Sequence, residues 1–322
     1  MTRRCVACST STRVPEPTSR LRLGTRTSRL ATWQAEHVAR TLEAAWPGLA
    51  VELVPFVTEG DRTLDAPLPE IGGKGVFTLE LEAALLDGRI DLAVHSLKDL
   101  PTDDPAGLVL GAITEREDAR DAWICPAGHA LASLPEGAVV GTSSLRRASQ
   151  LLRLRPDLDI RSIRGNVETR IRKAESPAYA ATVLACAGLA RLELTERATA
   201  VFSFDEMLPA PGQAALAVQV RAGDATVRER VAALDHGPTR DAVMAERAFL
   251  AALGGGCSAP IAALGTPTDR GLHLRGRIVS LDGARTVEAE ATAVGHGVDV
   301  AVGLGRRLAE QVLAGGARAL LP

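Results

Sequence analysis

Residues 139–154 read VVGTSSLRRASQLLRL, which places a strand, a turn and a helix in direct succession. The apolar run 139–141 is typical of a short buried strand, and the hydroxyl residues at 142–144 are typical of a helix start. From 145 to 154 the apolar residues recur at helical spacing. A strand that continues through a polar turn into a helix is the repeating unit of α/β proteins, so this stretch predicts an α/β fold.

The same alternation extends outward from this stretch in both directions. Apolar runs predict strands at 21–23, 51–57, 90–94, 108–112, 160–163 and 182–184, and helical periodicity predicts helices at 30–42, 78–86 and 167–174. Alternation of this kind indicates mostly parallel sheets with helices on both faces.

From about residue 239 the predicted strands and helices no longer alternate. A long helix at 240–253 precedes a glycine loop, strands at 272–279 and 286–293, and a final helix at 298–313. We therefore predict two α/β lobes, similar to those of periplasmic binding proteins, and a small C-terminal α+β domain. The predicted boundaries are a disordered extension at 1–20, a first lobe at 21–114 and 213–234, a second lobe at 115–212 and the C-terminal domain at 237–322.

The composition is that of a soluble globular protein and argues against several classes of function. The chain has 322 residues, enough for two or three domains, and 46% of them are hydrophobic. Its 39 acidic and 37 basic residues nearly balance, which disfavours a protein that coats a polyanion. Aromatic residues are only 3% of the chain, too few for platforms that stack single-stranded nucleic acid. The longest uncharged run, 248–268, is broken by glycines and a proline, so we expect no membrane-spanning helix.

The N-terminal segment and the cysteines indicate a cytoplasmic protein. Residues 1–20 are basic and rich in Ser and Thr but have no apolar core, so they do not resemble a secretory signal. Five cysteines at irregular spacings fit a reducing compartment better than a disulfide framework. The pair Cys5 and Cys8 is weak evidence for a metal, and we predict no metal site. Cys125 and Cys186 fall in apolar segments, where we expect inert thiols in buried strands.

Ligands of parallel α/β sheets bind beyond the carboxyl ends of the strands, and two of the loops expected there carry isolated cations. The loop 24–28 places Arg26 at a helix start, although a capped helix with a solvated arginine is an equally good interpretation.

The next such loop, 95–102, holds Lys98 beside Asp99. A surface ion pair, worth at most about 1 kcal/mol, is the alternative reading of these two residues. The chain contains only 3 lysines against 34 arginines, which favours a function for Lys98. His95 in the same loop is better interpreted as a histidine of the core.

The turn 141–147 and the turn that begins at Arg164 predict an anion-binding site. Free backbone N–H groups, the helix dipole and three hydroxyls precede Arg146 and Arg147 in the first turn. Between Arg146 and Lys173 there are nine bases and three acids, so several carboxylates or phosphates are expected to bind there. Nucleic acid is a rival ligand, but no helix-turn-helix, zinc or RRM signature accompanies the charge.

The loop 254–260 reads GGGCSAP and presents Cys257 after three glycines. A tight turn with an incidental thiol is one interpretation. Because glycines let another group approach the backbone closely and no nearby base suggests a hydrolase nucleophile, a covalent attachment point is the sharper one. The stretch 60–75, rich in glycine and proline, is typical of a lid or of a disordered loop, and Lys74 lies at its end.

Taken together, these segments resemble the hydroxymethylbilane synthase (porphobilinogen deaminase) family from about residue 21 to the end of the chain. The matching motifs occur in the family's order and are GTRTS, TEGD, GGKGVFT, HSLKDLPT, GTSSLRR, RGNVETR, AGLARL, PAPGQ and GGGCSAPI.

The resemblance implies an enzyme that condenses four porphobilinogen molecules head to tail with loss of ammonia and then hydrolyses off the linear tetrapyrrole. It implies a dipyrromethane cofactor in thioether linkage to Cys257, and Asp99 as the catalytic residue. The implied cofactor-binding residues are Lys98, Ser143, Ser144, Arg146, Arg147, Arg164 and Asn166. The implied substrate-binding residues are Arg26, Ser28, Gln34, Lys74, Phe77, Arg170 and Arg191.

These residue types suit the implied chemistry. Each pyrrole carries an acetate and a propionate, and the planar fork of arginine binds carboxylates in a bidentate manner. Loss of ammonia leaves a cationic azafulvene, which a fixed carboxylate such as Asp99 can stabilise while it transfers protons. Such acid–base help is typically worth about 10²–10⁴ in rate.

The sequence departs from the family pattern at three positions that affect hinge stiffness and lid electrostatics. Ala214 follows PAPGQ where glycine is common, Leu79 stands where a lysine is frequent, and Ala119 replaces a frequent proline.

The resemblance also bears on partners. It implies porphobilinogen as substrate, no nucleic acid, no membrane, a monomer, and hand-off of the product to uroporphyrinogen-III synthase. A solute receptor or regulator effector domain is the main rival, and a nucleic-acid-binding protein is the third candidate. The intact mass of the purified protein separates them, because only the synthase carries two linked pyrroles.

Overall fold

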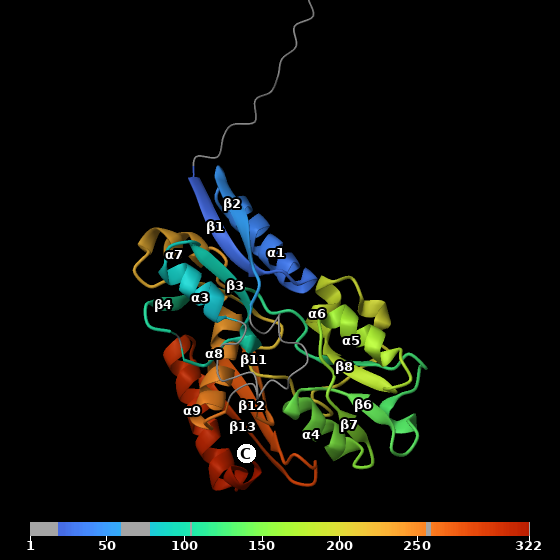
Figure 1. Cartoon of the computed structure of the whole chain (residues 1–322). Coiled ribbons are helices and arrows are strands. Elements are labelled where there is room, and N and C mark those ends of the chain that lie inside the picture. Colours follow the sequence, from blue (N-terminus) through green and yellow to red (C-terminus); the bar gives the residue numbers. More distant parts are fainter. Residues whose placement is uncertain (1–18, 59–77, 104, 256–258, 322) are drawn as a thin grey trace, which may run out of the picture.

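The computed structural model describes residues 19–58, 78–103, 105–255 and 259–321. It contains two five-stranded sheets and one three-stranded sheet. Figure 1 shows the two larger sheets in separate lobes, with the C-terminal unit packed below the first lobe and beside the second. The predicted extension at 1–20 falls almost wholly outside the described residues, although Ser19 and Arg20 already belong to the first strand.

The first lobe is built on a sheet in the order β2-β1-β3-β10-β4. Its strands are β1 (Ser19–Arg26), β2 (Leu49–Phe56), β3 (Leu92–Ser96), β4 (Leu108–Ile113) and β10 (Leu216–Arg221), and its helices are α1 (Arg29–Ala45), α3 (Leu79–Leu86) and α7 (Ala225–Ala232). The strands β1, β2 and β3 are parallel, whereas β10 is antiparallel to both of its neighbours. The buried side chains of Leu23, Leu42 and Val218 belong to one core between this sheet and its helices.

The second lobe repeats this plan with a sheet in the order β7-β6-β8-β5-β9. Its strands are β5 (Asp121–Ile124), β6 (Val139–Gly141), β7 (Asp159–Arg161), β8 (Ala181–Ala185) and β9 (Ala200–Val201), and its helices are α4 (Leu145–Leu154), α5 (Val167–Ala174) and α6 (Cys186–Arg191). The strands β6, β7 and β8 are parallel, and β5 is antiparallel to β8. Trp123 and Val140 lie in the core beneath the helices.

The C-terminal unit packs two long helices against an antiparallel sheet. The sheet has the strands β11 (Ile261–Thr268), β12 (Gly271–Val279) and β13 (Thr286–Val294), and the helices are α8 (Gly237–Ala252) and α9 (Val298–Ala314). Glycine permits the close packing of the helices, because a Cβ atom at Gly305 would lie 2.3 Å from the carbonyl oxygen of Ala245.

The predicted class, α/β with two lobes and a small C-terminal α+β domain, is confirmed. The strand–helix alternation agrees with the structure at nearly every predicted element, because apolar periodicity reflects which face of each element is buried.

Three expectations need correction. Both large sheets are mixed rather than mostly parallel, since one strand in each enters from a crossover and runs antiparallel. Two further strands were not predicted, the buried β10 and β11, whose last three residues are exposed. Cys186 is the first residue of α6 and does not lie in a strand, while Cys125 follows β5 and is buried.

Candidate active site

The antiparallel strands bring two segments from distant parts of the chain to the carboxyl edges of the parallel strands. Leu216, at the start of β10, pairs with Ser96 at the end of β3, so the segment before β10 lies beside the loop that carries Lys98. Asp121, at the start of β5, pairs with Ala185 at the end of β8. A residue that precedes an antiparallel strand therefore reaches the edge at which ligands of parallel sheets bind.

Helix α4 begins at this edge with its predicted hydroxyl turn. The Ser144 hydroxyl caps the helix by accepting a hydrogen bond from the backbone N–H of Arg147 (3.4 Å). Ser143 donates to the carbonyl oxygen of Ile163 (2.8 Å) and lies 2.8 Å from the hydroxyl of Ser162. The hydroxyls thus fix the start of α4 against the loop that follows β7.

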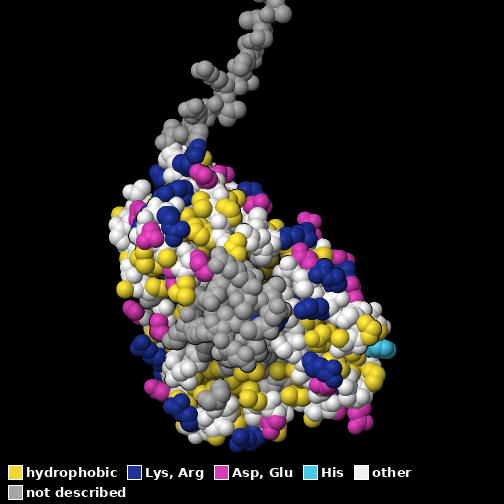
Figure 2. All heavy atoms as spheres, viewed as in Figure 1, with side chains coloured by type: hydrophobic (Ala, Val, Ile, Leu, Met, Phe, Trp, Pro, Cys, Tyr) yellow, Lys and Arg dark blue, Asp and Glu magenta, His cyan; other side chains and the backbone are white. Residues whose placement is uncertain are grey.

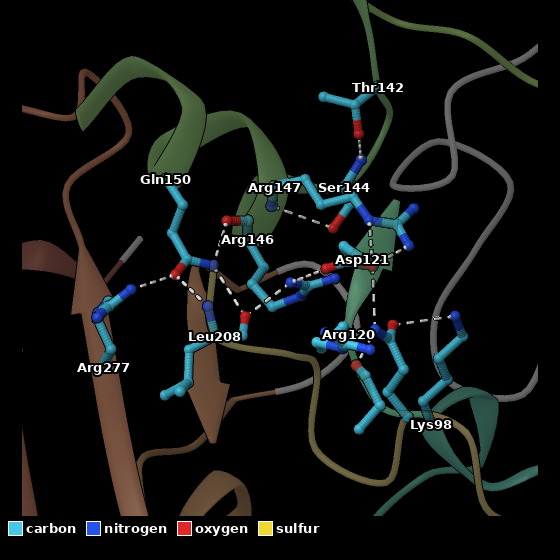
Figure 3. A network of polar contacts seen from close by, with 12 residues as sticks. Lys98, Arg120, Asp121, Thr142, Ser144, Arg146, Arg147, Gln150, Leu208 and Arg277 are labelled. Carbon is cyan, nitrogen blue, oxygen red and sulfur yellow. Dashed lines mark hydrogen bonds and ion pairs between the residues drawn. The ribbon is translucent and has the colours of Figure 1, made fainter. Parts of the chain in front are cut away.

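Arg146 and Arg147 converge on the buried carboxylate of Asp121 (Figure 3). Arg146 Nη1 donates to Asp121 Oδ2 (2.7 Å), and Arg147 donates to Oδ1 through Nη2 (2.7 Å) and Nε (3.2 Å). Burial opposes ionisation of Asp121, but the two guanidinium charges outweigh it and hold the pKa of this carboxyl well below its usual range.

Gln213 connects this ion-pair cluster to Lys98 in the first lobe. Its Nε2 donates to Asp121 Oδ1 (3.0 Å) and to the carbonyl oxygen of Ala119 (2.8 Å), and its Oε1 accepts from Lys98 Nζ (3.3 Å). Burial lowers the pKa of Lys98 to about 8, helped by the charges of Arg147 and Arg146 and opposed by Asp99 and Asp121.

Arg164, Arg170 and Asn166 lie in and after the second predicted turn. Asn166 caps α5 by accepting from the backbone N–H of Thr169 (2.9 Å), and Arg170 Nε donates to the carbonyl oxygen of Gly165 (2.8 Å). Arg164 Nη1 is buried and has no hydrogen-bond partner in the described part of the chain.

Arg170 interacts electrostatically with Asp99 of the first-lobe loop. Burial lowers the pKa of Arg170 to about 10, with Arg147 and Arg164 acting in the same direction and Asp99 against them. Asp99 is the last residue of a 3₁₀ turn (Leu97–Asp99), and its side chain is exposed.

The structure therefore brings together most of the predicted cofactor site. Five cations are grouped with two carboxylates, and the members of this cationic cluster are Lys98, Arg146, Arg147, Arg164, Arg170, Asp99 and Asp121. An excess of positive charge among largely buried side chains suits a ligand that carries several carboxylates.

The other predicted substrate-binding residues lie where α1 meets β3 and α6. Ser28 caps α1, and the buried Gln34 donates to the Ser96 hydroxyl (2.9 Å). Arg191 is buried, donates to the carbonyl oxygen of Ala214 (2.6 Å) and lies 5.9 Å from the ring centre of Trp33. Burial lowers the pKa of Arg191 to about 10.

The remaining predicted residues are placed as follows. Arg26 is the last residue of β1. Lys74, Phe77 and Cys257 lie outside the described residues.

Two residues of the site, Asp121 and Gln213, were missed by the sequence reading. Asp121 directly precedes an apolar run, and Gln213 closes the PAPGQ motif, so both carried a local signal. The expectation of mostly parallel sheets directed attention to the loops that follow strands, whereas Asp121 and Gln213 lie at the entry to antiparallel strands.

The visible surface offers no comparable concentration of charge. On the face in Figure 2, acidic and basic side chains are interspersed over the described residues, and apolar side chains lie between them. Among the described residues there is no helix long and apolar enough to span a bilayer and no group of three potential metal ligands.

Two α/β lobes with a cationic cluster at their junction have the architecture and the charge that suit a protein for small polycarboxylates. The family model "Porphobilinogen deaminase, dipyromethane cofactor binding domain" matches residues 21–229, and "Porphobilinogen deaminase, C-terminal domain" matches residues 241–314. The chain belongs to the porphobilinogen deaminase family, whose enzymes are transferases.

Curated relatives agree over nearly the whole chain. The porphobilinogen deaminase of Syntrophotalea carbinolica is 52% identical, over 94% of this chain and 95% of its own. That of Moorella thermoacetica is 51% identical, with the same coverage.

Similar solved structures include the methionine-binding protein MetQ, with a TM-score of 0.42 at 16% identity over 66% of this chain and 88% of that one. The BenM effector-binding domain has a TM-score of 0.39 at 14% identity, over 66% of this chain and 89% of that one. These likenesses concern the fold alone.

Proposed function

We propose that the hydroxymethylbilane synthase reaction of this chain takes place at the junction of the two lobes, with Asp99 as the catalytic carboxylate and Cys257 as the attachment point of dipyrromethane. The reaction of the family is the stepwise condensation of four porphobilinogen molecules, followed by hydrolytic release of the linear tetrapyrrole. The observation that carries the proposed site is the cationic cluster, whose hydrogen bonds cross the junction of the lobes. Gln213 bonds both Asp121, which accepts from Arg146 and Arg147, and Lys98, which precedes Asp99.

The residues of the cluster fit the cofactor. Dipyrromethane carries acetate and propionate groups, and the cluster consists of guanidinium and ammonium donors that suit carboxylates. Two of these donors, Arg164 Nη1 and Arg146 Nε, are buried without a hydrogen-bond partner among the described residues. When bound, the cofactor supplies the terminal pyrrole to which the first substrate is joined.

The roles of the chain's own residues are proposed from the family resemblance and, for the ionised side chains, from their charge. Lys98, Arg146, Arg147 and Arg164 bind the cofactor carboxylates together with Ser143, Ser144 and Asn166, and Arg170 binds substrate carboxylates. Asp99 donates a proton to the departing amine of porphobilinogen and stabilises the cationic pyrrole that remains.

The further substrate contacts are proposed from the family resemblance alone. They are Arg26, Ser28, Gln34, Lys74, Phe77 and Arg191. The hydrogen bonds of Ser28, Gln34 and Arg191 within the protein give each of them a structural role as well.

We also propose the domain boundaries 21–114 with 213–234, 115–212 and 237–322, which agree with the membership of the three sheets. A cytoplasmic monomer that passes its product to uroporphyrinogen-III synthase completes the proposal.

Intact mass measurement tests the attachment site directly. The wild-type protein should exceed its sequence mass by two linked pyrroles, and Cys257→Ser should lack this excess, because a hydroxyl is a far poorer nucleophile than a thiolate. Cys125→Ser and Cys186→Ser are the matched controls and should retain the cofactor. A Cys257→Ser protein that still carries dipyrromethane would place the attachment elsewhere.

A further inference from the structure

Asp121 has no role in the proposed reaction, yet it lies at the centre of the cationic cluster. Its side chain is fully buried, and its two oxygens accept hydrogen bonds from Arg146, Arg147 and Gln213. A buried carboxylate between two proposed ligand-binding arginines calls for a physical explanation.

We propose that Asp121 is a positioning residue: its carboxylate holds the guanidinium groups of Arg146 and Arg147 side by side, so that their remaining N–H groups are available to carboxylates of the cofactor and growing chain. This inference rests on the proposed function of the two arginines and adds the group that orients them.

Helix geometry shows why such a group is needed. Arg146 and Arg147 are consecutive in α4, so their side chains leave the helix about 100° apart. Both guanidinium groups nevertheless reach the same carboxylate, at 2.7 Å each. Without an anion between them, two buried like charges would repel each other and separate.

The hydrogen bonds to Asp121 leave part of each guanidinium group unused. Arg146 employs Nη1, which also donates to the carbonyl oxygen of Leu208 (2.8 Å), and Arg147 employs Nε and Nη2. Within the described residues, neither Nη2 of Arg146 nor Nη1 of Arg147 makes a hydrogen bond. One edge of each arginine is held, and N–H groups remain for a ligand.

Gln213 extends the effect of Asp121 across the junction of the lobes. It bonds Asp121 through Nε2 and Lys98 through Oε1, so the carboxylate is connected to the residue that precedes Asp99. The charged groups that act on the Lys98 ammonium are Asp99 and Asp121, which favour its charge, and Arg147 and Arg146, which oppose it. Loss of the Asp121 charge should therefore shift the titration of Lys98 to lower pH.

The first lobe provides a matched control at the edge of its sheet that lies opposite the proposed site. Asp91 also bridges two arginines, since it accepts from Arg22 (Nη2, 2.9 Å) and Arg221 (Nη2, 3.3 Å). Asp91 precedes the parallel strand β3 and so lies at the amino edge of the sheet, away from the proposed site.

The test compares Asp121→Asn with Asp91→Asn in the full chain. For Asp121→Asn we expect a reduced cofactor-bearing fraction by intact mass, and kcat/KM for porphobilinogen lower by about 10²-fold within that fraction, since a shift of about 1 Å in a positioning group can cost this much. The alkaline limb of its pH profile should move to lower pH. Asp91→Asn should lower the unfolding midpoint and leave cofactor content, kcat/KM and pH profile unchanged.

Two outcomes separate this inference from the proposal beneath it. If Asp121→Asn loses stability but its cofactor-bearing fraction keeps the wild-type kcat/KM and pH profile, Asp121 is structural only and the inference is wrong. If Arg147→Leu carries the normal amount of cofactor and has normal turnover, Arg147 does not bind the cofactor or the growing chain. The proposed function of the arginines is then wrong, whatever the role of Asp121.

Should Asp121→Asn not fold, a crystal structure of the wild-type holoenzyme decides the matter. We expect Asp121 to remain within hydrogen-bond distance of both guanidinium groups while cofactor carboxylates contact their other N–H groups. Displacement of Asp121 from the arginines by a cofactor carboxylate would overturn the inference.

Discussion

The pKa of the Lys98 ammonium group lies in a pH range in which enzyme kinetics can be measured. Burial and two neighbouring arginines lower its pKa to about 8 from the ordinary 10.5. Because its charge is favoured below this pKa and lost above it, carboxylate binding should weaken as the pH rises through about 8.

We predict that KM for porphobilinogen increases above this pH in the wild-type enzyme. Lys98→Arg should remove this limb of the profile, because a guanidinium group stays charged throughout the range. A limb that persists unchanged in Lys98→Arg would assign the titration to another group.

A substitution of Asp99 separates an effect on the chemical step from an effect on substrate binding. Asp99→Asn keeps the shape of the side chain but removes its charge and its exchangeable proton, so turnover should fall by at least about 10²-fold while KM changes little. Single-turnover kinetics on the cofactor-bearing fraction measures this.

Asp103 provides the matched control for Asp99. It is an exposed carboxylate in the segment that follows the same 3₁₀ turn, and Asp103→Asn should leave turnover unchanged. Equal effects of the two substitutions would remove the catalytic assignment of Asp99.

At the scale of single elements, the crossover into β10 contains a strained residue. Ala214 has a φ of 74°, in the left-handed region, where a Cβ atom costs roughly 1–2 kcal/mol. Its carbonyl oxygen accepts the hydrogen bond from Arg191, so this backbone conformation is held in place by the second lobe. The family resemblance predicts glycine at this position.

Ala214→Gly should therefore raise the free energy of unfolding by about 0.5–1 kcal/mol. This is the net of two effects, because glycine relieves the backbone strain but loses more conformational entropy on folding than alanine does. Denaturant unfolding followed by circular dichroism measures the change. Ala215→Gly is the control, because Ala215 is buried without a positive φ, and it should destabilise. Equal destabilisation by both substitutions would show that Ala214 is not strained.

At the scale of the whole molecule, Glu246 joins all three units. It lies on α8, is fully buried and forms an ion pair with Arg116 (2.5 Å), which belongs to the first crossover. Its oxygens also accept from the backbone N–H groups of Gly212 in the second crossover (2.7 Å) and of Gly265 in β11 (2.7 Å). One carboxylate thus fixes both crossovers to the C-terminal unit.

We predict that Glu246→Gln destabilises the protein by about 3–5 kcal/mol, because Arg116 keeps its charge in a largely buried position without a partner. Glu310→Gln, on the exposed face of α9, should change stability by no more than about 0.5 kcal/mol. Thermal unfolding of the two variants tests this, and similar melting temperatures would mean that the Glu246 charge contributes little.

The sequence by itself determined most of the elements and the cationic part of the site. Buried faces impose a periodicity that can be read locally, so α4 agrees with its predicted bounds at both ends. Lys98, Arg146, Arg147 and Arg164 follow predicted strands, and the sheet places such residues at one edge. The order of the motifs pointed to the family that the comparisons confirm.

Only the tertiary structure decided which residues reach the site from the start of an antiparallel strand rather than from the end of a parallel one. The antiparallel strands β5 and β10 are buried almost throughout, like the parallel strands β3 and β8 beside them, so their apolar pattern does not reveal the direction in which they run. Because β5 and β10 run antiparallel, Asp121 at the start of β5 and Gln213 before the start of β10 lie at the ligand edge. The pairing of Asp121 with Arg146 and Arg147 is likewise a long-range contact between β5 and α4, which local sequence does not specify.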